Sequence, residues 1–351
     1  MRGMMVKRRL GITMGDPAGI GAEIALKALT YQGVYECIPI IIGDREPLED
    51  ALAFTNLAFR LNAVEDVAQA RGEYGIIDYL DLKILGPHEW EYKKAAPLPG
   101  KASVKYIEKA VELAKSKAID AIITGPINKE SINMAGYNYA GHTEILGELT
   151  GTKHFAMLLA SKELRVIHVT THVSMRDACD LITEDRVYSV IYLAREGMRQ
   201  LGFPNPTIGV AGFNAHCSEN GLFGDQEEKA IIPAVRRAAS EGLLVDGPIP
   251  PDTVFVKALA GQYDIVVAMY HDQGHIPLKL TGFKLDLKTG KYTAMSGINC
   301  TIGTPIIRTS VDHGTAYDRA GEGRANEESM VEAIMTAITM VNRRVATEGS
   351  I

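Results

Sequence analysis

Short apolar runs alternate with amphipathic stretches along most of this 351-residue chain, and this alternation constrains the fold more than any other feature. Buried apolar runs separated by helical patterns are typical of parallel sheets covered by helices. We expect strands at 10–14, 38–42, 121–124, 155–159, 164–172, 207–213, 265–270, 298–302 and 306–309, with the pair 155–159 and 164–172 antiparallel. We expect helices at 17–29, 102–118, 130–134, 143–149, 186–201, 227–240 and 328–345. The sequence therefore predicts an α/β fold.

The length predicts two domains, at about 150 residues each. Gly125-Pro126 ends a buried strand, and the pattern of elements changes after it. We therefore expect a first α/β/α domain at 1–128 plus 309–351 and a second at 129–308. The polar stretch KLDLKTGKYTAMS at 284–296 predicts an exposed hairpin or flap.

Composition excludes several classes of function. The net charge is −6 and no strongly basic face is evident, which argues against nucleic acid as a partner. No apolar run reaches the ~20 residues needed to cross a membrane. The basic N-terminus lacks the apolar core of a signal peptide, and the four cysteines form no CxxC pair. These features predict a cytoplasmic protein with reduced thiols.

Three histidines each follow an apolar run that is predicted to be a strand: His172 in VTTHVSMRD, His216 in FNAHCSE and His271 in AMYHDQGH. Ligands of open α/β sheets bind beyond the carboxyl ends of the strands. Three imidazoles there could hold one divalent metal and leave positions open for substrate. The alternative is three unrelated histidines that bond to backbone. Cys217 could be a thiolate ligand, a nucleophile or a small filler.

Two glycine-bearing segments open predicted helices. GDPAGIGAE at 15–23 is neither a dinucleotide fingerprint nor a P-loop, so it is a tight turn or a ligand loop. Asp16 and Pro17 there suit the N-cap and first turn of a helix. In GHTE at 141–144, Thr143 is an N-cap, or His142 and Thr143 together hold an anionic oxygen.

Charged and amide side chains gather in the last third of the chain. Lys279, Asn299 and Arg308 could together enclose a phosphate or carboxylate. Asp272 could orient a metal-binding histidine, act as a base or cap a turn, and His275 stays unassigned. The DHGT stretch that begins at Asp312 is a cofactor loop or a turn.

These segments together resemble the 4-hydroxythreonine-4-phosphate dehydrogenase family. The matching stretches include ITMGDPAGIGAEI, GHTE, FNAHCSENGLFGDQE, AMYHDQGHIPLKL and GINCTIGTPIIRTSVDHGTAYDRAG, and they span nearly the whole chain. The resemblance implies two α/β/α domains with a cleft between them, similar to isocitrate and isopropylmalate dehydrogenases. It also implies a homodimer with shared active sites, with dimer contacts in the second domain, and NAD bound without the usual fingerprint.

The resemblance also implies roles for individual residues. It assigns His172, His216 and His271 to one divalent metal, which could be Zn, Mg, Mn or Co. Its substrate contacts are His142, Thr143, Lys279, Asn299 and Arg308. Asp252 matches an acid near the reacting centre, with Asp272 as the other candidate base, and Asp312, His313 and Gly314 are expected at the cofactor.

The implied activity is NAD-dependent oxidation and decarboxylation of a 4-phosphorylated 3-hydroxy acid. The longer 284–296 segment and HCSENGLFGDQE favour the branch that oxidises 4-phospho-D-threonate or D-erythronate over the branch that oxidises 4-phosphooxy-L-threonine in pyridoxal phosphate biosynthesis. The branch that oxidises dihydrodiol dicarboxylates is an alternative, although its substrate does not require residues that bind a phosphate. A non-catalytic phospho-ligand-binding homologue and a metal-dependent hydrolase are the rival classes.

Overall fold

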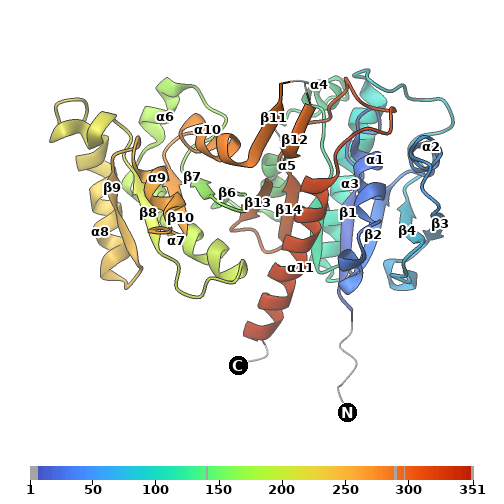
Figure 1. Cartoon of the computed structure of the whole chain (residues 1–351), viewed down its shortest axis with the longest axis horizontal. Coiled ribbons are helices and arrows are strands. Elements are labelled where there is room, and N and C mark those ends of the chain that lie inside the picture. Colours follow the sequence, from blue (N-terminus) through green and yellow to red (C-terminus); the bar gives the residue numbers. More distant parts are fainter. Residues whose placement is uncertain (1–6, 140, 288–290, 296, 349–351) are drawn as a thin grey trace, which may run out of the picture. The chain divides into compact units, whose positions relative to one another are not determined.

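The computed structural model describes residues 7–139, 141–287, 291–295 and 297–348. The chain forms two compact units: a first unit of Met1–Thr152 with Pro305–Ile351, and a second unit of Lys153–Thr304. Each unit carries strands and helices in alternation (Figure 1), so the expected α/β class is confirmed.

The first unit contains a parallel sheet of six strands in the order β3-β4-β2-β1-β5-β14. Its strands are β1 (Arg9–Thr13), β2 (Ile38–Gly43), β3 (Arg60–Val64), β4 (Ile76–Asp81), β5 (Ala121–Thr124) and β14 (Ile307–Val311). Its helices are α1 (Gly21–Ala28), α2 (Arg45–Thr55), α3 (Pro97–Lys115), α4 (Lys129–Met134), α5 (His142–Thr150) and α11 (Glu328–Glu348). Helix α3 packs on β1, β2 and β5, and α11 packs on β5 and β14.

The main sheet of the second unit has six described strands in the order β13-β6-β7-β10-β8-β9. Its strands are β6 (Ala156–Ala160), β7 (Arg165–His168), β8 (Ile208–Ala211), β9 (Val245–Ile249), β10 (Ile265–Ala268) and β13 (Ile298–Ile302). Its helices are α6 (Met175–Leu181), α7 (Glu184–Gln200), α8 (Ile232–Ser240), α9 (Val254–Leu259) and α10 (His271–Gly282). Strand β6 runs antiparallel to both of its neighbours, which confirms the antiparallel pair expected there.

The unit boundaries differ from the expected ones at 128/129 and 308/309. Helices α4 and α5 pack against α3, so the chain stays with the first unit until Thr152. It returns at Pro305, just before β14 pairs with β5. Contacts made by two short helices therefore set the first boundary, and the break after Gly125-Pro126 does not.

The first helix begins later than expected, at Gly21 instead of residue 17. Asp16 is not its N-cap: the Asp16 side chain accepts from the backbone N–H of Ala18 at 2.8 Å, and the Asp16 carbonyl accepts from Gly19 at 3.0 Å. Asp16 thus closes a separate turn before the helix. Thr143 is not an N-cap either, because α5 already begins at His142 with Gly141 as its cap residue.

The predicted hairpin at 284–296 is formed in part by β11 (Phe283–Asp286) and β12 (Lys291–Met295), which pair antiparallel. Residues 288–290 and 296 of that prediction lie outside the described residues. Sequence patterns missed β3, β4, β9, α2, α6 and α9. They also missed that the polar stretch after β10 is the start of helix α10.

Candidate metal and substrate site

Three adjacent strands of the second unit, β7, β10 and β8, deliver the three predicted metal ligands. These strands are parallel to one another, so their carboxyl ends lie at one edge of the sheet. His172 follows β7, His271 opens α10 directly after β10, and His216 follows β8. The fold therefore brings the three segments to the edge where ligands of α/β sheets bind.

Two of these rings lie close together. The centroids of the His172 and His271 rings are 5.8 Å apart, with an interplanar angle of 41°. Backbone bonds continue the pairing past the ends of the strands, because Thr170 donates its N–H to the carbonyl of Met269 at 3.2 Å. Two imidazoles that share one metal would have centroids roughly 5 Å apart at a metal–nitrogen distance of about 2.1 Å.

The third ligand lies in an unusual backbone segment. The five residues from His216 to Asn220 all have positive φ angles, between 47° and 63°. Left-handed backbone costs non-glycine residues on the order of 1 kcal/mol each, and such strain clusters at functional sites. The HCSEN segment is therefore held in place by the structure around it.

Glu227 supplies much of that support. Its carboxylate is 1% exposed and accepts from the backbone N–H groups of Phe213 and Asn214, both at 2.7 Å, and from the Asn214 side chain at 2.8 Å. Glu227 also opens a π-helix over Glu227–Ile231, a feature that is frequent at functional sites. The sequence prediction overlooked Glu227.

Gln273 connects the His271 segment with the strand that precedes His216. Its side-chain oxygen accepts from the backbone N–H of Met269 at 2.7 Å, and its side-chain NH₂ donates to the carbonyl of Gly212 at 2.8 Å. Because Gln273 is buried, these bonds fix the ends of β10 and β8 relative to each other.

Two further histidines lie behind the predicted ligands: the sequence prediction left His275 unassigned and overlooked His168 as a site residue. His275 stacks on His271 with centroids 3.7 Å apart and an interplanar angle of 13°, and His168 lies 4.8 Å from His275. Burial, followed by the charge of His275, lowers the pKa of His168 to about 3. Burial and then His271 lower the pKa of His275 to about 4. Helical spacing from His271 could have indicated His275, had the HDQGH stretch been interpreted as helix.

In the first unit, two predicted substrate contacts lie together at the end of β5. His142 forms a hydrogen bond of 3.1 Å through Nε2 to the carbonyl of Gly125. Arg308 is 1% exposed and donates from Nη2 and Nε to Oγ1 of Thr124, at 2.6 and 3.1 Å. Burial, and then the positive charge of Arg308, lowers the pKa of His142 well below its usual value. The arrangement keeps His142 neutral beside a buried guanidinium.

The other predicted substrate contacts are distributed over both units. Thr143 is half-buried in the first turn of α5 in the first unit. Lys279 and Asn299 belong to the second unit: Lys279 is exposed on α10 with its ammonium 5.6 Å from the ring centroid of Phe283, and Asn299 pairs with Leu159 in the sheet.

The residues that follow the predicted cofactor positions Asp312, His313 and Gly314 pack against the turn that precedes α1. Ile20 donates its backbone N–H to the carbonyl of Thr315 at 3.1 Å, and Tyr317 donates its hydroxyl to Asp16 at 3.0 Å. Further along, the buried Glu23 accepts from the N–H of Ala325 at 2.7 Å. The GDPAGIGAE segment thus supports this loop.

The two candidate bases are both exposed. Asp272 accepts a hydrogen bond of 2.6 Å from Nδ1 of His271, and the Asp272 side chain is 70% exposed. Asp252 precedes α9 and lies close enough to Cys217 to affect it. Burial, then the charges of Glu227 and Asp252, raise the pKa of the Cys217 thiol to about 11, so this residue is protonated at neutral pH. A raised thiol pKa argues against Cys217 as a nucleophile.

The donor set partly fits a divalent metal. Because the Asp272 carboxylate only accepts, Nδ1 of His271 is the protonated nitrogen, and its Nε2 lone pair is available to a metal. The spacing of His172 and His271 fits shared coordination. Within the described part of one chain, however, no three potential ligands are gathered closely enough to hold an ion.

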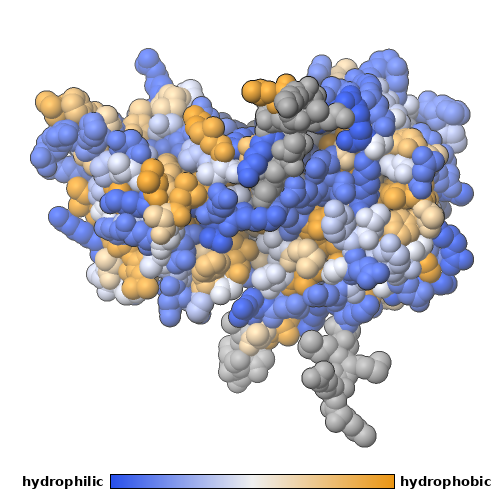
Figure 2. All heavy atoms as spheres, in the orientation of Figure 1, coloured by the Kyte–Doolittle hydropathy of each residue, from blue (hydrophilic) through white to orange (hydrophobic). Residues whose placement is uncertain are grey.

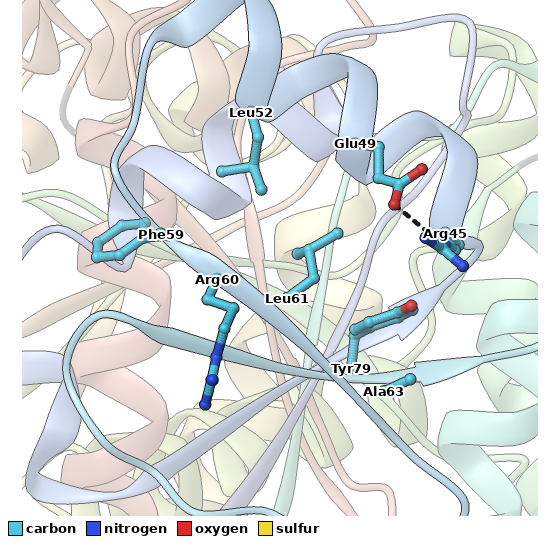
Figure 3. A pocket seen from close by; sticks show the side chains of 8 residues that line it. All are labelled: Arg45, Glu49, Leu52, Phe59, Arg60, Leu61, Ala63 and Tyr79. Atoms are coloured by element: carbon cyan, nitrogen blue, oxygen red, sulfur yellow. Dashed lines mark hydrogen bonds and ion pairs between the residues drawn. The ribbon is translucent and has the colours of Figure 1, made fainter.

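Two hollows of the first unit contain none of the predicted site residues. One of about 510 Å³ lies beside α2, β3 and β4 (Figure 3), where Arg45 is paired with Glu49 at 2.7 Å. The other, of about 540 Å³, is lined by Arg8, Asp120 and parts of α3 and α11.

Comparison with known proteins identifies the family. The model of the pyridoxal phosphate biosynthetic protein PdxA family matches residues 35–337. The chain belongs to this family. A relative from Oceanobacillus iheyensis, provisionally named D-threonate 4-phosphate dehydrogenase, is 47% identical over 96% of this chain and 99% of its own length. The D-threonate 4-phosphate dehydrogenase of Cupriavidus necator is 43% identical over 95% of this chain and 98% of its own length.

Solved structures agree with this assignment. The 4-hydroxythreonine-4-phosphate dehydrogenase of Klebsiella pneumoniae is 40% identical, with a TM-score of 0.82 over 95% of this chain and 100% of that one. The one from Burkholderia phymatum is 43% identical, with a TM-score of 0.79 over 96% and 99%. These structures confirm the expected fold, and the relatives' names support an oxidoreductase. None of the described helices combines the length and apolarity that a membrane crossing requires.

Proposed function

We propose that this protein is an NAD- and divalent-metal-dependent dehydrogenase that oxidises and decarboxylates 4-phospho-D-threonate or its D-erythronate isomer. The observation that carries the proposal is the similarity to proteins named D-threonate 4-phosphate dehydrogenase, at 43–47% identity over nearly the full length of both chains. A four-carbon acid with a phosphate at C4 carries an anionic group at each end that the protein would bind.

Oxidation of 4-phosphooxy-L-threonine is the second candidate, because the solved relatives at 40–43% identity carry the name 4-hydroxythreonine-4-phosphate dehydrogenase. A terephthalate dihydrodiol dehydrogenase from Burkholderia xenovorans is more distant, at 26% identity and a TM-score of 0.65. The two phospho-acids differ at C2, where one bears a hydroxyl and the other an amine.

The chain's own residues would bind the substrate at its two ends. Arg308 offers a planar guanidinium and His142 a neutral imidazole, a pair suited to a phosphate. Lys279 and Asn299 are proposed to complete the phosphate-binding site with an ammonium and an amide. A phosphate that is bound away from C3 positions the reacting carbon and can lower the barrier of the chemical step.

His172, His216 and His271 would hold the metal, with Asp272 fixing the tautomer of His271. When bound, the metal would lower the pKa of the C3 hydroxyl and NAD would accept the hydride. Asp252 or Asp272 would accept the hydroxyl proton, since both are exposed carboxylates beside ligand segments. The resulting β-keto acid would then lose CO₂ and leave a three-carbon keto phosphate.

We further propose that two copies share each site. The His172 and His271 rings lie together within one chain, and a copy of His216 from a partner would complete the set. Exposed apolar side chains of the second unit offer a surface for the partner, among them Ile276 at 57% and Leu280 at 77% exposure on α10. Figure 2 shows hydrophobic side chains at the surface over α10. Because the four cysteines form no disulfide within the described residues, we propose that the protein is cytoplasmic.

A substrate panel tests the proposal. The purified protein is mixed with NAD and, separately, with 4-phospho-D-threonate, 4-phospho-D-erythronate, 4-phosphooxy-L-threonine or unphosphorylated threonate, and NADH absorbance is followed. We expect NADH and CO₂ with 4-phospho-D-threonate or 4-phospho-D-erythronate, whereas product from 4-phosphooxy-L-threonine alone would favour the second candidate. Exhaustive treatment with EDTA should abolish activity, and Zn²⁺, Mn²⁺ or Co²⁺ should restore it. Ligand binding without NADH formation would indicate the non-catalytic alternative, and full activity after chelation would refute the metal.

A further inference from the structure

Four imidazoles form a row from the core of the second unit to its surface. His168 at the end of β7 is 1% exposed, His275 in α10 is 8% exposed, His271 is half-buried and His172 is exposed. Successive ring centroids are 4.8, 3.7 and 5.8 Å apart. Two members of the row are predicted metal ligands, and the other two have no role in the proposed function.

The closest contact in the row is between His275 and His271. Their rings are nearly parallel, with centroids 3.7 Å apart and an interplanar angle of 13°. His275 also donates from Nδ1 to the backbone carbonyl of His271 at 2.9 Å, because a carbonyl can only accept. One residue therefore contacts both the ring face and the backbone of the predicted ligand.

The remaining support for the His271 ring is weak. Its Nδ1 donates to Asp272, whose side chain is 70% exposed, and a hydrogen bond in contact with solvent contributes little. His271 is also the first residue of α10, where no earlier turn of the helix restricts its side chain. The buried ring of His275 is the firmest surface against which His271 rests.

His275 is itself held from behind by His168. Gly274 allows this approach, since a Cβ at position 274 would lie 2.4 Å from Nε2 of His168. That nitrogen is buried and has no hydrogen-bond partner among the described residues. Nδ1 of the same ring donates to the backbone carbonyl of Met157 at 3.4 Å, which fixes the His168 ring on the sheet behind His275.

We propose that His275 is a positioning residue, backed by His168, that holds the imidazole of His271 in the orientation required to bind a divalent metal. The inference rests on the proposed function, because it takes His271 to be a metal ligand. Residues that orient metal ligands typically change metal affinity by about 10–100-fold when they are substituted.

Cobalt binding provides a test that does not depend on activity. The chelated full-length protein is titrated with Co²⁺, and the visible absorption of the bound ion gives both its affinity and its coordination. We expect His275→Ala to weaken Co²⁺ binding by about 10–100-fold and to alter the spectrum. His275→Phe, which keeps a flat ring against His271, should recover most of the affinity. His154→Ala removes an exposed histidine of the same unit and should bind as the wild type does.

The outcomes separate the inference from the proposed function. If the wild-type protein binds no Co²⁺, the metal site and the inference both fail. If the wild type binds Co²⁺ and folded His275→Ala has unchanged affinity and spectrum, only the inference fails. An equal loss in His275→Ala and His275→Phe would show that a flat ring against His271 is not what supports metal binding, which overturns the positioning role by stacking. Should His275→Ala not fold, the comparison of His275→Phe with the wild type still tests the role of stacking.

Discussion

Arg308 is the predicted substrate contact that the structure characterises most fully. Its guanidinium is almost completely buried and donates twice to Thr124. A buried arginine is stabilised by multiple hydrogen bonds, and an anionic substrate would add charge-assisted ones. The same residue therefore links two strands of the sheet and, in the proposed function, binds the phosphate.

Arg308→Lys should raise the KM for a phosphorylated acid by about tenfold or more, because an ammonium cannot reproduce the two parallel bonds of a guanidinium. The loss should be much smaller for an unphosphorylated analogue. Steady-state kinetics with both substrates measure the difference. Equal losses with the two substrates would contradict a role in binding phosphate, and a thermal melt checks that the variant is folded.

The depressed pKa of His142 makes a prediction about stability. Its pKa in the folded chain lies well below the unfolded value of about 6.5, so between these values the unfolded chain binds a proton that the folded chain does not. The free energy of unfolding should therefore fall as the pH decreases below about 6.5. In His142→Gln this part of the pH dependence should disappear.

Thermal unfolding from pH 7.5 to pH 5 tests this prediction (about the range in which a histidine titrates). The Tm of the wild type should fall more on acidification than that of His142→Gln. His154→Gln, at an exposed position, should keep the wild-type slope. Parallel curves for the wild type and His142→Gln would show that His142 is not desolvated in the folded protein.

At the scale of elements, the ends of the strands in the second unit are held by buried side chains. Glu227 holds the segment after β8, and Gln273 links that segment to the end of β10. Both side chains bond to backbone groups that have left the sheet, where the ladder no longer provides partners. The ligand-bearing segments are therefore fixed by helices that follow them in the sequence.

Glu227→Gln should destabilise the chain by about 2 kcal/mol, because an amide presents one NH₂ where the carboxylate accepts three bonds. It should also increase amide hydrogen exchange in the segment that carries His216. Urea unfolding and exchange mass spectrometry measure the two effects. Glu228→Gln, an exposed neighbour in the same helix, is the matched control. Unchanged exchange around His216 would mean that another group holds the segment.

At the scale of the whole molecule, the separation of His216 from the two clustered rings leads to a prediction about assembly. In a dimer with shared sites, each metal site takes His271 from one chain and His216 from the other. His271→Ala and His216→Ala therefore remove ligands that different chains supply to a site. Mixed dimers of these two variants would then contain one site with all three ligands and one site with two ligands missing.

Each variant alone should be nearly inactive. After unfolding, mixing and refolding together, activity should recover to about a quarter of the wild-type value, since half of the dimers would be mixed and each would have one intact site. The oligomeric state is checked by light scattering. A stable dimer without any recovery would contradict sites that are shared in this way. Refolding each variant alone controls for recovery that does not depend on mixing.

The amino-acid sequence alone was enough to infer the α/β class, the family and the identity of the polar side chains at the strand ends. The strands at Ala121–Thr124 and Ile298–Ile302 begin and end where they were expected, because each opens with an apolar residue and is followed directly by a glycine. The elements that were missed include edge strands β3 and β9, whose half-exposed residues lack the continuous apolar signal of buried strands.

Contacts in the folded chain were needed to establish which helices belong to which unit and where α1 begins. They also showed how the polar segments after the strands are supported. The contacts of His275 with His271 and of Glu227 with the His216 segment join residues through stacking and buried hydrogen bonds. Such contacts depend on distance in space and on exclusion of water, neither of which is encoded in a local pattern of apolar and polar residues.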